Sequence, residues 1–295
     1  ILDDLQIAPQ TSKTITISIP KPIIKEGDEA KFAKLEYFIE FSFKEKNGNS
    51  MRPAGTEIAY DVFNLNIDSP RGDKPKDLPK IKLADNDKEV VVLNDKFRFV
   101  IDKQQGVPTS FVYIGEEMLA GPIRPNFWRA PTDNDNGARL HEHFAVWRNP
   151  TMYLKNFETK IENGVAIVVA SYDMPSVEAK MRITYTINGE GAVKVEQAMT
   201  TTEGAKVSNM FRYGMRMELP ARFNQLLYYG RGEVENYCDR KSCADIGLYE
   251  QSVAEQYHEQ LARPQESGTR SDLRYYNILD TSGAGLKIKA ATPFS

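Results

Sequence analysis

Hydrophobic and polar residues alternate with a period of two along much of this chain. The stretches TITISIP (residues 14–20), EYFIEFSF (36–43) and KMRITYTI (180–187) each place their large apolar side chains on one side. Such alternation is typical of an antiparallel strand with one buried face. The same criteria predict further strands at EVVVL (89–93), FRFVID (97–102), GVAIVVASYDM (164–174), AVKVEQAM (192–199), MRMELP (215–220), QLLYYG (225–230) and GLKIKAA (285–291).

Helical patterns are few and short, with candidates only at residues 141–147 and 252–262. Many short strands separated by turn signals predict an all-β protein built from sandwiches. Residues 68–88 are rich in Pro, Asp and Lys and poor in aromatic residues, which predicts an exposed linker. We therefore expect a small immunoglobulin-like β-sandwich over residues 1–80 and a larger antiparallel one over residues 81–295.

The composition argues against several classes of protein. The 295 residues are 41% hydrophobic and 27% charged, which is ordinary for a globular protein. A net charge of −3 argues against nucleic-acid binding, and no apolar run approaches the roughly 20 residues of a membrane-spanning helix. Cys238 and Cys243 are too few for a disulfide framework and lack the spacing of a zinc pair, so we expect two free thiols.

The segment RPNFWRAPTDNDNGARL, residues 124–140, carries the densest chemistry in the chain. On a strand, Asp133 and Asp135 would point to one face, as a glycosidase pair requires, but a catalytic acid also needs an apolar pocket that raises its pKa. The flanking asparagines favour a turn instead, because Asx side chains bond to their own backbone.

Two metal-binding interpretations of this segment are weaker. A calcium loop that starts at Asp133 fails in register, because Gly137 falls at position 5 and the EF-hand pattern needs glycine at position 6. His141 and His143 form an H-x-H pair without an obvious third ligand. We therefore predict no metal site.

On residues alone, we favour a rigid anchor that leads into a mobile loop. Phe127 and Trp128 would be buried in a core, and Arg124 or Arg129 would hold an aspartate in a bidentate pair. Gly137 tolerates positive φ and would release the chain into a flexible stretch.

This segment also resembles the signature at the start of the last domain of β-galactosidases of glycoside hydrolase family 2. Residues 228–253 (YYGRGEVENYCDRKSCADIGLYEQSV) are similar to the family's G-R-G-P-x-E-N-Y-x-D-R segment, and residues 263–276 (RPQESGTRSDLRYY) to its R-P-Q-E-N-G-x-R-x-D-x-R segment. Residues 36–65 resemble its fourth domain. The resemblance covers the rear of domain four and most of domain five. It implies that the larger sandwich is a galactose mutarotase-like supersandwich that continues beyond residue 295.

The resemblance implies that the chain is a non-catalytic C-terminal part of a retaining β-galactosidase that hydrolyses terminal β-D-galactosides. In the family, the two catalytic glutamates lie on a (β/α)8 barrel that precedes these domains, so we expect no catalytic residue and no hydrolysis by this part alone. The expected partners are the remaining domains of the polypeptide, a β-galactoside bound by the complete enzyme, and further copies in a homo-oligomer. We expect no cofactor in this chain, whereas the family implies Mg²⁺ or Na⁺ in the complete enzyme. The compartment stays open between cytoplasm and periplasm.

The resemblance also implies roles for single residues. In the family, the segment after D-N-D-x-G runs toward the mouth of the barrel and shifts when sugar binds. Gly137 is then the candidate hinge, and Asn136, Ala138 and Arg139 are the candidate substrate-loop residues. The other motif residues are assigned to the scaffold: Phe127, Trp128, Arg129, Asp133 and Asp135, and also Asn236, Tyr237, Asp239 and Arg240, for which we expect a turn closed by hydrogen bonds and an Asp–Arg pair. Arg263, Glu266, Arg270, Asp272 and Arg274 alternate in sign, which predicts a solvated or paired face.

Two other functions are open. A stand-alone carbohydrate-binding β-sandwich would use exposed aromatic residues among Tyr228, Tyr229, Tyr275 and Tyr276. A mutarotase-like epimerase would need a general acid and a base near pH 7, but His141, His143 and His258 lie in no matching motif.

Overall fold

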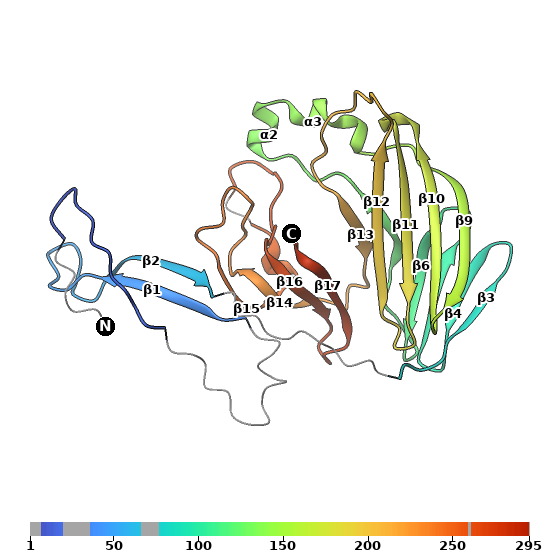
Figure 1. The fold of residues 1–295 in the computed structure, drawn as a ribbon, viewed down its shortest axis with the longest axis horizontal. Coiled ribbons are helices and arrows are strands. Elements are labelled where there is room, and N and C mark those ends of the chain that lie inside the picture. Colours follow the sequence, from blue (N-terminus) through green and yellow to red (C-terminus); the bar gives the residue numbers. More distant parts are fainter. Residues whose placement is uncertain (1–6, 20–35, 66–76, 259–260, 295) are drawn as a thin grey trace. The chain divides into compact units, whose positions relative to one another are not determined.

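The computed structural model describes residues 7–19, 36–65, 77–258 and 261–294. The chain divides into two compact units, Ile1–Pro75 and Lys76–Ser295, so the boundary comes slightly before the one expected between residues 80 and 81. Antiparallel strands dominate the described residues, and the protein is all-β, as predicted (Figure 1). In these residues, no helix is long and apolar enough to cross a membrane.

The described part of the first unit contains one two-stranded antiparallel sheet, formed by β1 (Phe38–Lys44) and β2 (Glu57–Asn64). Phe41 and Phe63 meet edge to face across this sheet, with ring centroids 5.9 Å apart. The strand predicted at residues 14–20 is wrong for residues 14–19, which form no strand, and Pro20 lies outside the described residues. Alternation makes a segment amphipathic, but a strand also needs a neighbour for its backbone hydrogen bonds.

Two antiparallel sheets form the sandwich of the second unit (Figure 1). The five-stranded sheet follows chain order and consists of β3 (Lys82–Asp85), β4 (Glu89–Leu93), β5 (Phe97–Asp102), β6 (Val107–Tyr113) and β7 (Glu116–Glu117). The four-stranded sheet has the order β12-β11-β10-β9, from β9 (Tyr153–Glu162), β10 (Val165–Met174), β11 (Ala179–Ile187) and β12 (Val193–Thr201). Alternating side chains from both sheets share one core, which includes Val90, Val92, Phe99, Ile101, Val168, Met181, Ile183, Tyr185 and Ile187.

The remaining elements of this unit lead out of the sandwich. Strands β8 (Gly121–Asn126) and β13 (Gly214–Glu218) pair as a two-stranded sheet. A last sheet has the order β15-β14-β16-β17, from β14 (Gln225–Gly232), β15 (Asp245–Ser252), β16 (Leu273–Leu279) and β17 (Gly285–Phe294). The short helices are α2 (Asp133–Gly137), α3 (Leu140–His143) and the 3-10 turns η1 (Ala145–Trp147), η2 (Pro175–Val177) and η3 (Ala254–Gln256).

The two predicted helices have different outcomes. Residues 141–147 lie within α3 and η1, so a short helical segment is present there. Of residues 252–262, only η3 is helical, and residues 259–260 lie outside the described part of the chain. A single 3-10 turn therefore replaces the second predicted helix in the described residues.

The start of the second unit lies against a turn of the four-stranded sheet. Residues 68–76 of the predicted linker lie outside the described residues, but residues 82–85 form β3, so the prediction is wrong there. Leu83 is drawn into the sheet because it packs against the core. The carbonyl oxygen of Pro79 lies 1.7 Å from the position that a Cβ on Gly189 would take, and the Asn94 side chain donates a hydrogen bond of 2.8 Å to the Gly189 carbonyl.

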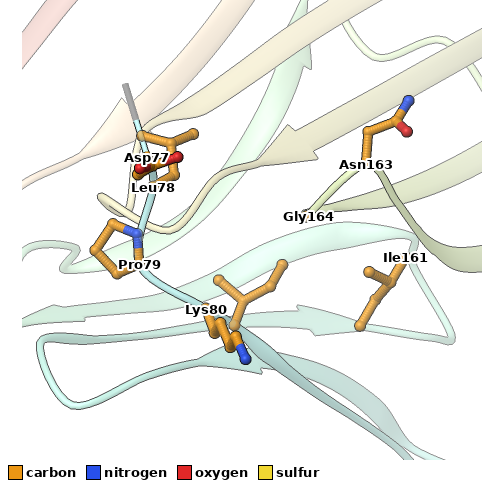
Figure 2. Close-up of a pocket in the computed structure, with 8 residues that line it drawn as sticks. Asp77, Leu78, Pro79, Lys80, Ile161, Asn163 and Gly164 are labelled. Carbon is orange, nitrogen blue, oxygen red and sulfur yellow. The ribbon is translucent and has the colours of Figure 1, made fainter. Parts of the chain in front are cut away.

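A surface cavity of about 380 Å³ opens beside this leading segment (Figure 2). Its lining is formed by residues 77–81 together with Ile161, Asn163 and Gly164. None of these residues belongs to the three motifs, so the cavity is not part of the candidate site.

Candidate functional site

The segment that follows β8 is anchored by aromatic side chains. Phe127 is 2% exposed and packs against Trp147 at 5.5 Å and Tyr213 at 5.9 Å between ring centroids. Trp128 is half-buried, and its ring meets that of Phe211 edge to face at 4.9 Å. Burying aromatic surface of this size stabilises a segment by a few kcal/mol, so the chain is held firmly just before the Asp-Asn-Asp-Asn-Gly run.

That run forms α2, a helix of one turn, rather than an Asx turn. Thr132 caps it: its hydroxyl oxygen accepts a hydrogen bond from the Asp135 backbone N–H at 3.2 Å, and the Asp135 carboxylate accepts one from the Thr132 N–H at 2.7 Å. This reciprocal arrangement is a capping box, in which two backbone donors at the start of a helix are satisfied by side chains. It makes Asp135 a structural residue.

Arg129 fixes the same carboxylate. Its Nη1 lies 2.6 Å from Oδ2 of Asp135, and its guanidinium lies 4.6 Å from the centroid of the Phe211 ring. The expected Arg–Asp pair is thus made by Arg129 to one carboxylate oxygen, while Arg124 donates to the Gln105 side chain at 2.6 Å. Burial alone would raise the pKa of Asp135, but the hydrogen bonds from Arg129 and Thr132 outweigh it and hold that pKa below the ordinary value. A carboxylate in this state stays ionised and is unsuited to act as a general acid.

The predicted loop residues lie directly after this anchor. Asn136, Gly137, Ala138 and Arg139 are all exposed. Asn136 and Gly137 form the end of α2, however, so only Ala138 and Arg139 connect α2 to α3, and the predicted loop is partly helical. Gly137 ends α2 without a positive φ, and the left-handed residue is Arg139, with φ of 54°. The Arg139 side chain is tied to Glu142 by a hydrogen bond of 3.1 Å from Nε. Gly137 therefore does not use the positive φ that glycine tolerates.

The first motif contacts the third through backbone groups. The Gln265 side chain accepts a hydrogen bond of 3.0 Å from the Asp133 N–H, and the Pro131 carbonyl accepts one of 3.2 Å from the Glu266 N–H. Glu266 also pairs with Arg212 at 3.2 Å. Hydrogen bonds therefore join residues 131–133, just before the exposed segment, to residues 265–266, more than a hundred positions later in the sequence.

The second and third motifs meet around Asn236, which is fully buried. Its amide nitrogen donates to the carbonyls of Arg231 (3.2 Å) and Val234 (3.0 Å), and its amide oxygen accepts from the Ser271 N–H (2.9 Å). Since an unpaired buried amide is costly, this network fixes the loop after β14 against the segment before β16.

Ion pairs surround this amide network. Asp272 binds Arg231 at 2.6 Å and Lys241 at 3.3 Å. Burial would raise the pKa of Asp272, but these two cations hold it below its usual range. In the third motif, Glu266 and Asp272 are thus ion-paired and Arg263 is exposed, as this pattern predicts. Arg270 departs from the prediction, because it is buried with no ion pair among the described residues.

The ion pair expected within the second motif joins different residues. Tyr237 and Arg240 exchange backbone hydrogen bonds of 3.0 Å, which closes the predicted turn. The guanidinium of Arg240, however, pairs with Glu235 at 2.7 Å rather than with Asp239, so the predicted Asp–Arg pair is wrong. Glu235 is 8% exposed and also accepts from the Gly268 N–H at 2.9 Å. The turn brings Arg240 back over Glu235 and leaves Asp239 exposed at its tip.

The four tyrosines proposed as sugar contacts do not share one surface. Tyr228 is fully buried and stacks between Tyr249 and Tyr276, whereas Tyr229 and Tyr275 are half-buried neighbours with ring centroids 6.0 Å apart. Lys287 lies 3.9 Å from the Tyr275 ring centroid. Tyr276 is also half-buried but its ring contacts the buried Tyr228, so Tyr229 and Tyr275 are the two of these four that are half-buried and in contact with each other.

The described residues provide no side-chain ligand set for a metal ion. No group of three or more His, Cys, Asp and Glu side chains is placed to hold one. His141 and His143 lie on α3, and Glu142 is the acidic neighbour of His141, at 3.7 Å. The Mg²⁺ or Na⁺ implied by the family resemblance is therefore not matched by a side-chain site in the described residues. Both cysteines are free and exposed, as predicted.

Three contributors to this site escaped the motif analysis: Thr132, Glu235 and Gln265. Thr132 and Asp135 stand three residues apart, which is the spacing of a capping box, so this signal was present in the sequence. Glu235 and Gln265 carry no such local signal, because their partners are distant along the chain.

The fold and these contacts define a class of protein: an all-β scaffold in which hydrogen bonds connect three sequence motifs and one short segment is exposed. A family model described as "Beta galactosidase small chain" matches residues 93–295, and one described as "Beta-galactosidase, domain 4" matches residues 1–66. The chain belongs to the β-galactosidase family.

Its relatives are much longer proteins. The chain is 32% identical over 287 residues to the β-galactosidase of Priestia megaterium, a match that covers 97% of this chain and 27% of the relative. It is 31% identical over 220 residues to the β-galactosidase of Lactobacillus delbrueckii subsp. bulgaricus, covering 74% of this chain and 21% of the relative. The chain therefore spans about a quarter of the length of these relatives.

Proposed function

We propose that this chain is the non-catalytic C-terminal region of a retaining β-galactosidase that hydrolyses terminal β-D-galactosides. It supports the catalytic barrel and supplies a mobile loop, residues 136–139, to the mouth of the active site. The names and lengths of the relatives support this role, because the chain matches about a quarter of proteins named β-galactosidase. The proposed partners are the remaining domains of the polypeptide and further copies in a homo-oligomer.

The observation that carries the proposal is the change from the buried Asp135 to the exposed residues 136–139, of which Asn136 and Gly137 still belong to α2. Asp135 is held by Arg129 and Thr132, while the next residues, 136–139, are exposed. A substrate-responsive loop needs a fixed base and a free tip, since loop closure moves a few residues about a rigid frame. This segment has the fixed base, and the exposed residues 136–139 are the candidates for the part that moves.

The ionisation of the buried and half-buried carboxylates favours a non-catalytic role for this chain. Retaining hydrolysis needs a carboxylic acid with a raised pKa and a carboxylate nucleophile about 5 Å away. The pKa values of Asp135, Glu235 and Asp272 all lie below their ordinary values. Burial opposes ionisation of each carboxyl, but hydrogen bonds and nearby cations outweigh burial and lower the pKa. In our proposal, the catalytic glutamates and any Mg²⁺ or Na⁺ belong to polypeptide outside this chain.

The test is Gly137→Ala in the complete enzyme. A Cβ at this position meets nothing within 4 Å, so the substitution adds stiffness without a clash. We expect kcat and KM for o-nitrophenyl β-galactoside to change together, because loop opening and closing are affected. Gly214→Ala is the matched control: it also has open space and no positive φ, and it should leave both constants unchanged.

Two results would contradict the proposal. Unchanged constants in the Gly137→Ala enzyme would remove the loop role. Hydrolysis of the same substrate by the purified 295-residue chain, free of contaminating enzyme, would show that the catalytic carboxylates lie within it.

A second function, carbohydrate binding by the chain itself, rests on the half-buried pair Tyr229 and Tyr275. The two ring planes are inclined at 48°, so the pair offers two angled apolar faces against which a sugar ring could pack. Titration of the chain with lactose tests this: binding that is lost in Tyr275→Ala supports it, and absence of any binding signal contradicts it.

A further inference from the structure

Arg270 is a buried cation that the roles assigned above do not use. It is 6% exposed, and among the described residues no carboxylate oxygen lies within ion-pair distance of its guanidinium. The arginines nearby in the fold are different, since Arg212, Arg231 and Arg240 each pair with an acidic side chain. Arg270 thus stands apart within the third motif.

The groups that bond directly to Arg270 are neutral, and Glu233, an acidic side chain whose charge acts on the Tyr228 hydroxyl, forms no ion pair with Arg270. Its Nε donates to the Tyr228 hydroxyl at 3.1 Å, Nη2 to the Gln251 side-chain oxygen at 3.3 Å, and Nη1 to the Thr269 carbonyl at 3.3 Å. A guanidinium carries five N–H donors, so one N–H on each terminal nitrogen has no acceptor here. A charge removed from water without a counter-ion is strongly unfavourable, and arginine cannot relieve this by losing its proton.

The surroundings of Arg270 favour a protein partner over a small anion. Gln256 bonds to the same Gln251 oxygen at 2.8 Å, and the next residue, Tyr257, is 67% exposed. The Gln251 amide also donates to the Glu233 carbonyl, and Val234, the next residue, is 53% exposed. Large exposed apolar side chains flanking a buried arginine are typical of protein interfaces, in which arginine and aromatic residues dominate the binding energy.

We propose that Arg270 binds the carboxylate of an aspartate or glutamate in the part of the β-galactosidase polypeptide that lies outside this chain. The proposal rests on the proposed function, because it requires that larger polypeptide. A planar guanidinium with a free N–H on each terminal nitrogen can bind a carboxylate in a two-bond arrangement. Val234 and Tyr257 then form the apolar rim that excludes water from the pair.

The experiment compares Arg270→Lys with Arg270→Gln in the complete polypeptide, using the urea midpoint of unfolding. If a carboxylate is bound, Lys keeps the charge that neutralises it, so the Lys variant is more stable than the Gln variant, and both are less stable than the wild type. If only the neutral groups of this chain hold the side chain, a buried ammonium without a partner is the worse choice, and the Gln variant is at least as stable as the Lys variant. That order would overturn the proposal.

Two controls separate this site from general effects. Arg263 lies in the same motif but is exposed, so Arg263→Lys and Arg263→Gln should unfold at the wild-type midpoint. In the 295-residue chain alone, the outside carboxylate is missing, and the order of the two Arg270 variants should reverse. An unreversed order would assign the partner to this chain and contradict the proposal. β-Galactosidase activity of the wild-type polypeptide is measured in a separate assay. An inactive wild-type polypeptide would contradict the proposed function, but the stabilities of the variants could still be compared.

Discussion

An oxygen of the Asp135 carboxylate lies 2.6 Å from Nη1 of Arg129, and both side chains are largely buried. The pair connects the aromatic anchor at Phe127 and Trp128 with the first turn of α2. Because the same carboxylate also caps the helix, one side chain decides where the rigid segment ends and the exposed loop begins.

Removal of this charge should destabilise the second unit. Breaking a buried ion pair from one side leaves an uncompensated charge and costs about 3 kcal/mol. We therefore expect Asp135→Asn to lower the free energy of unfolding in urea by about that amount. Asp133→Asn is the control, since Asp133 is exposed and its side chain makes no comparable contact. Equal losses in the two variants would show that the pair contributes little.

Stability should depend on pH in a defined direction. Burial opposes the ionisation of Asp135, but hydrogen bonds from Arg129 and Thr132 lower its folded-state pKa below the ordinary value. The unfolded-state pKa, about 4, is thus the higher of the two. The contribution of this group is fully present above that value and is lost as pH falls through the lower folded-state pKa. The urea midpoint should fall below about pH 4, and it should fall less steeply in Asp135→Asn than in the wild type.

Two exposed glycines should respond to alanine with opposite signs. Gly137 and Gly164 both have open space where a Cβ would lie, but Gly164 has φ of 78° and Gly137 has no positive φ. Gly137→Ala should raise the free energy of unfolding by about 0.5 kcal/mol, because it restricts the unfolded chain. Gly164→Ala should lower it by about 1 kcal/mol, because left-handed backbone disfavours a Cβ. Thermal unfolding of the two variants measures the difference, and a shared sign would contradict it.

A similar contrast is expected for two core tyrosines. The Tyr172 hydroxyl donates to the carbonyls of Gln105 and Gly106 at 2.8 and 2.9 Å, while the buried Tyr185 hydroxyl has no hydrogen-bond partner among the described residues. A buried hydroxyl without a hydrogen bond is unfavourable by about 1–3 kcal/mol. Tyr185→Phe should therefore leave stability unchanged or raise it, whereas Tyr172→Phe should lower it by about 1 kcal/mol. Greater loss in Tyr185→Phe would indicate an acceptor for that hydroxyl.

Alternation along the sequence was sufficient for most strands of the second unit. Strands β4, β5, β10 and β11 lie where the sequence predicts them. Each belongs to one of the two packed sheets and turns apolar side chains into the shared core. The prediction failed at residues 14–19, where the pattern is present without a neighbouring strand, and at residues 82–85, where a charged and proline-rich composition hid a strand. Both errors concern pairing, which a local pattern does not contain.

The candidate site was predictable to the extent that its contacts are local. The cap from Thr132 to Asp135 spans three residues and can be read from sequence spacing. The partner of Arg240 could not be read in this way, because the turn at Tyr237 directs the guanidinium back to Glu235 instead of to the adjacent Asp239. Likewise, the burial of Arg270 depends on Tyr228 and Gln251, which lie on two other strands.

The apposition of Pro79 and Gly189 limits which sequences this architecture tolerates. Every amino acid except glycine would place its first side-chain carbon almost on top of the proline oxygen. In a library of random variants, a change at Gly189 would therefore appear as a defect at the beginning of the second unit, far from it in sequence. Substitutions at position 189 are thus restricted by contact with a segment that lies about a hundred residues earlier in the sequence.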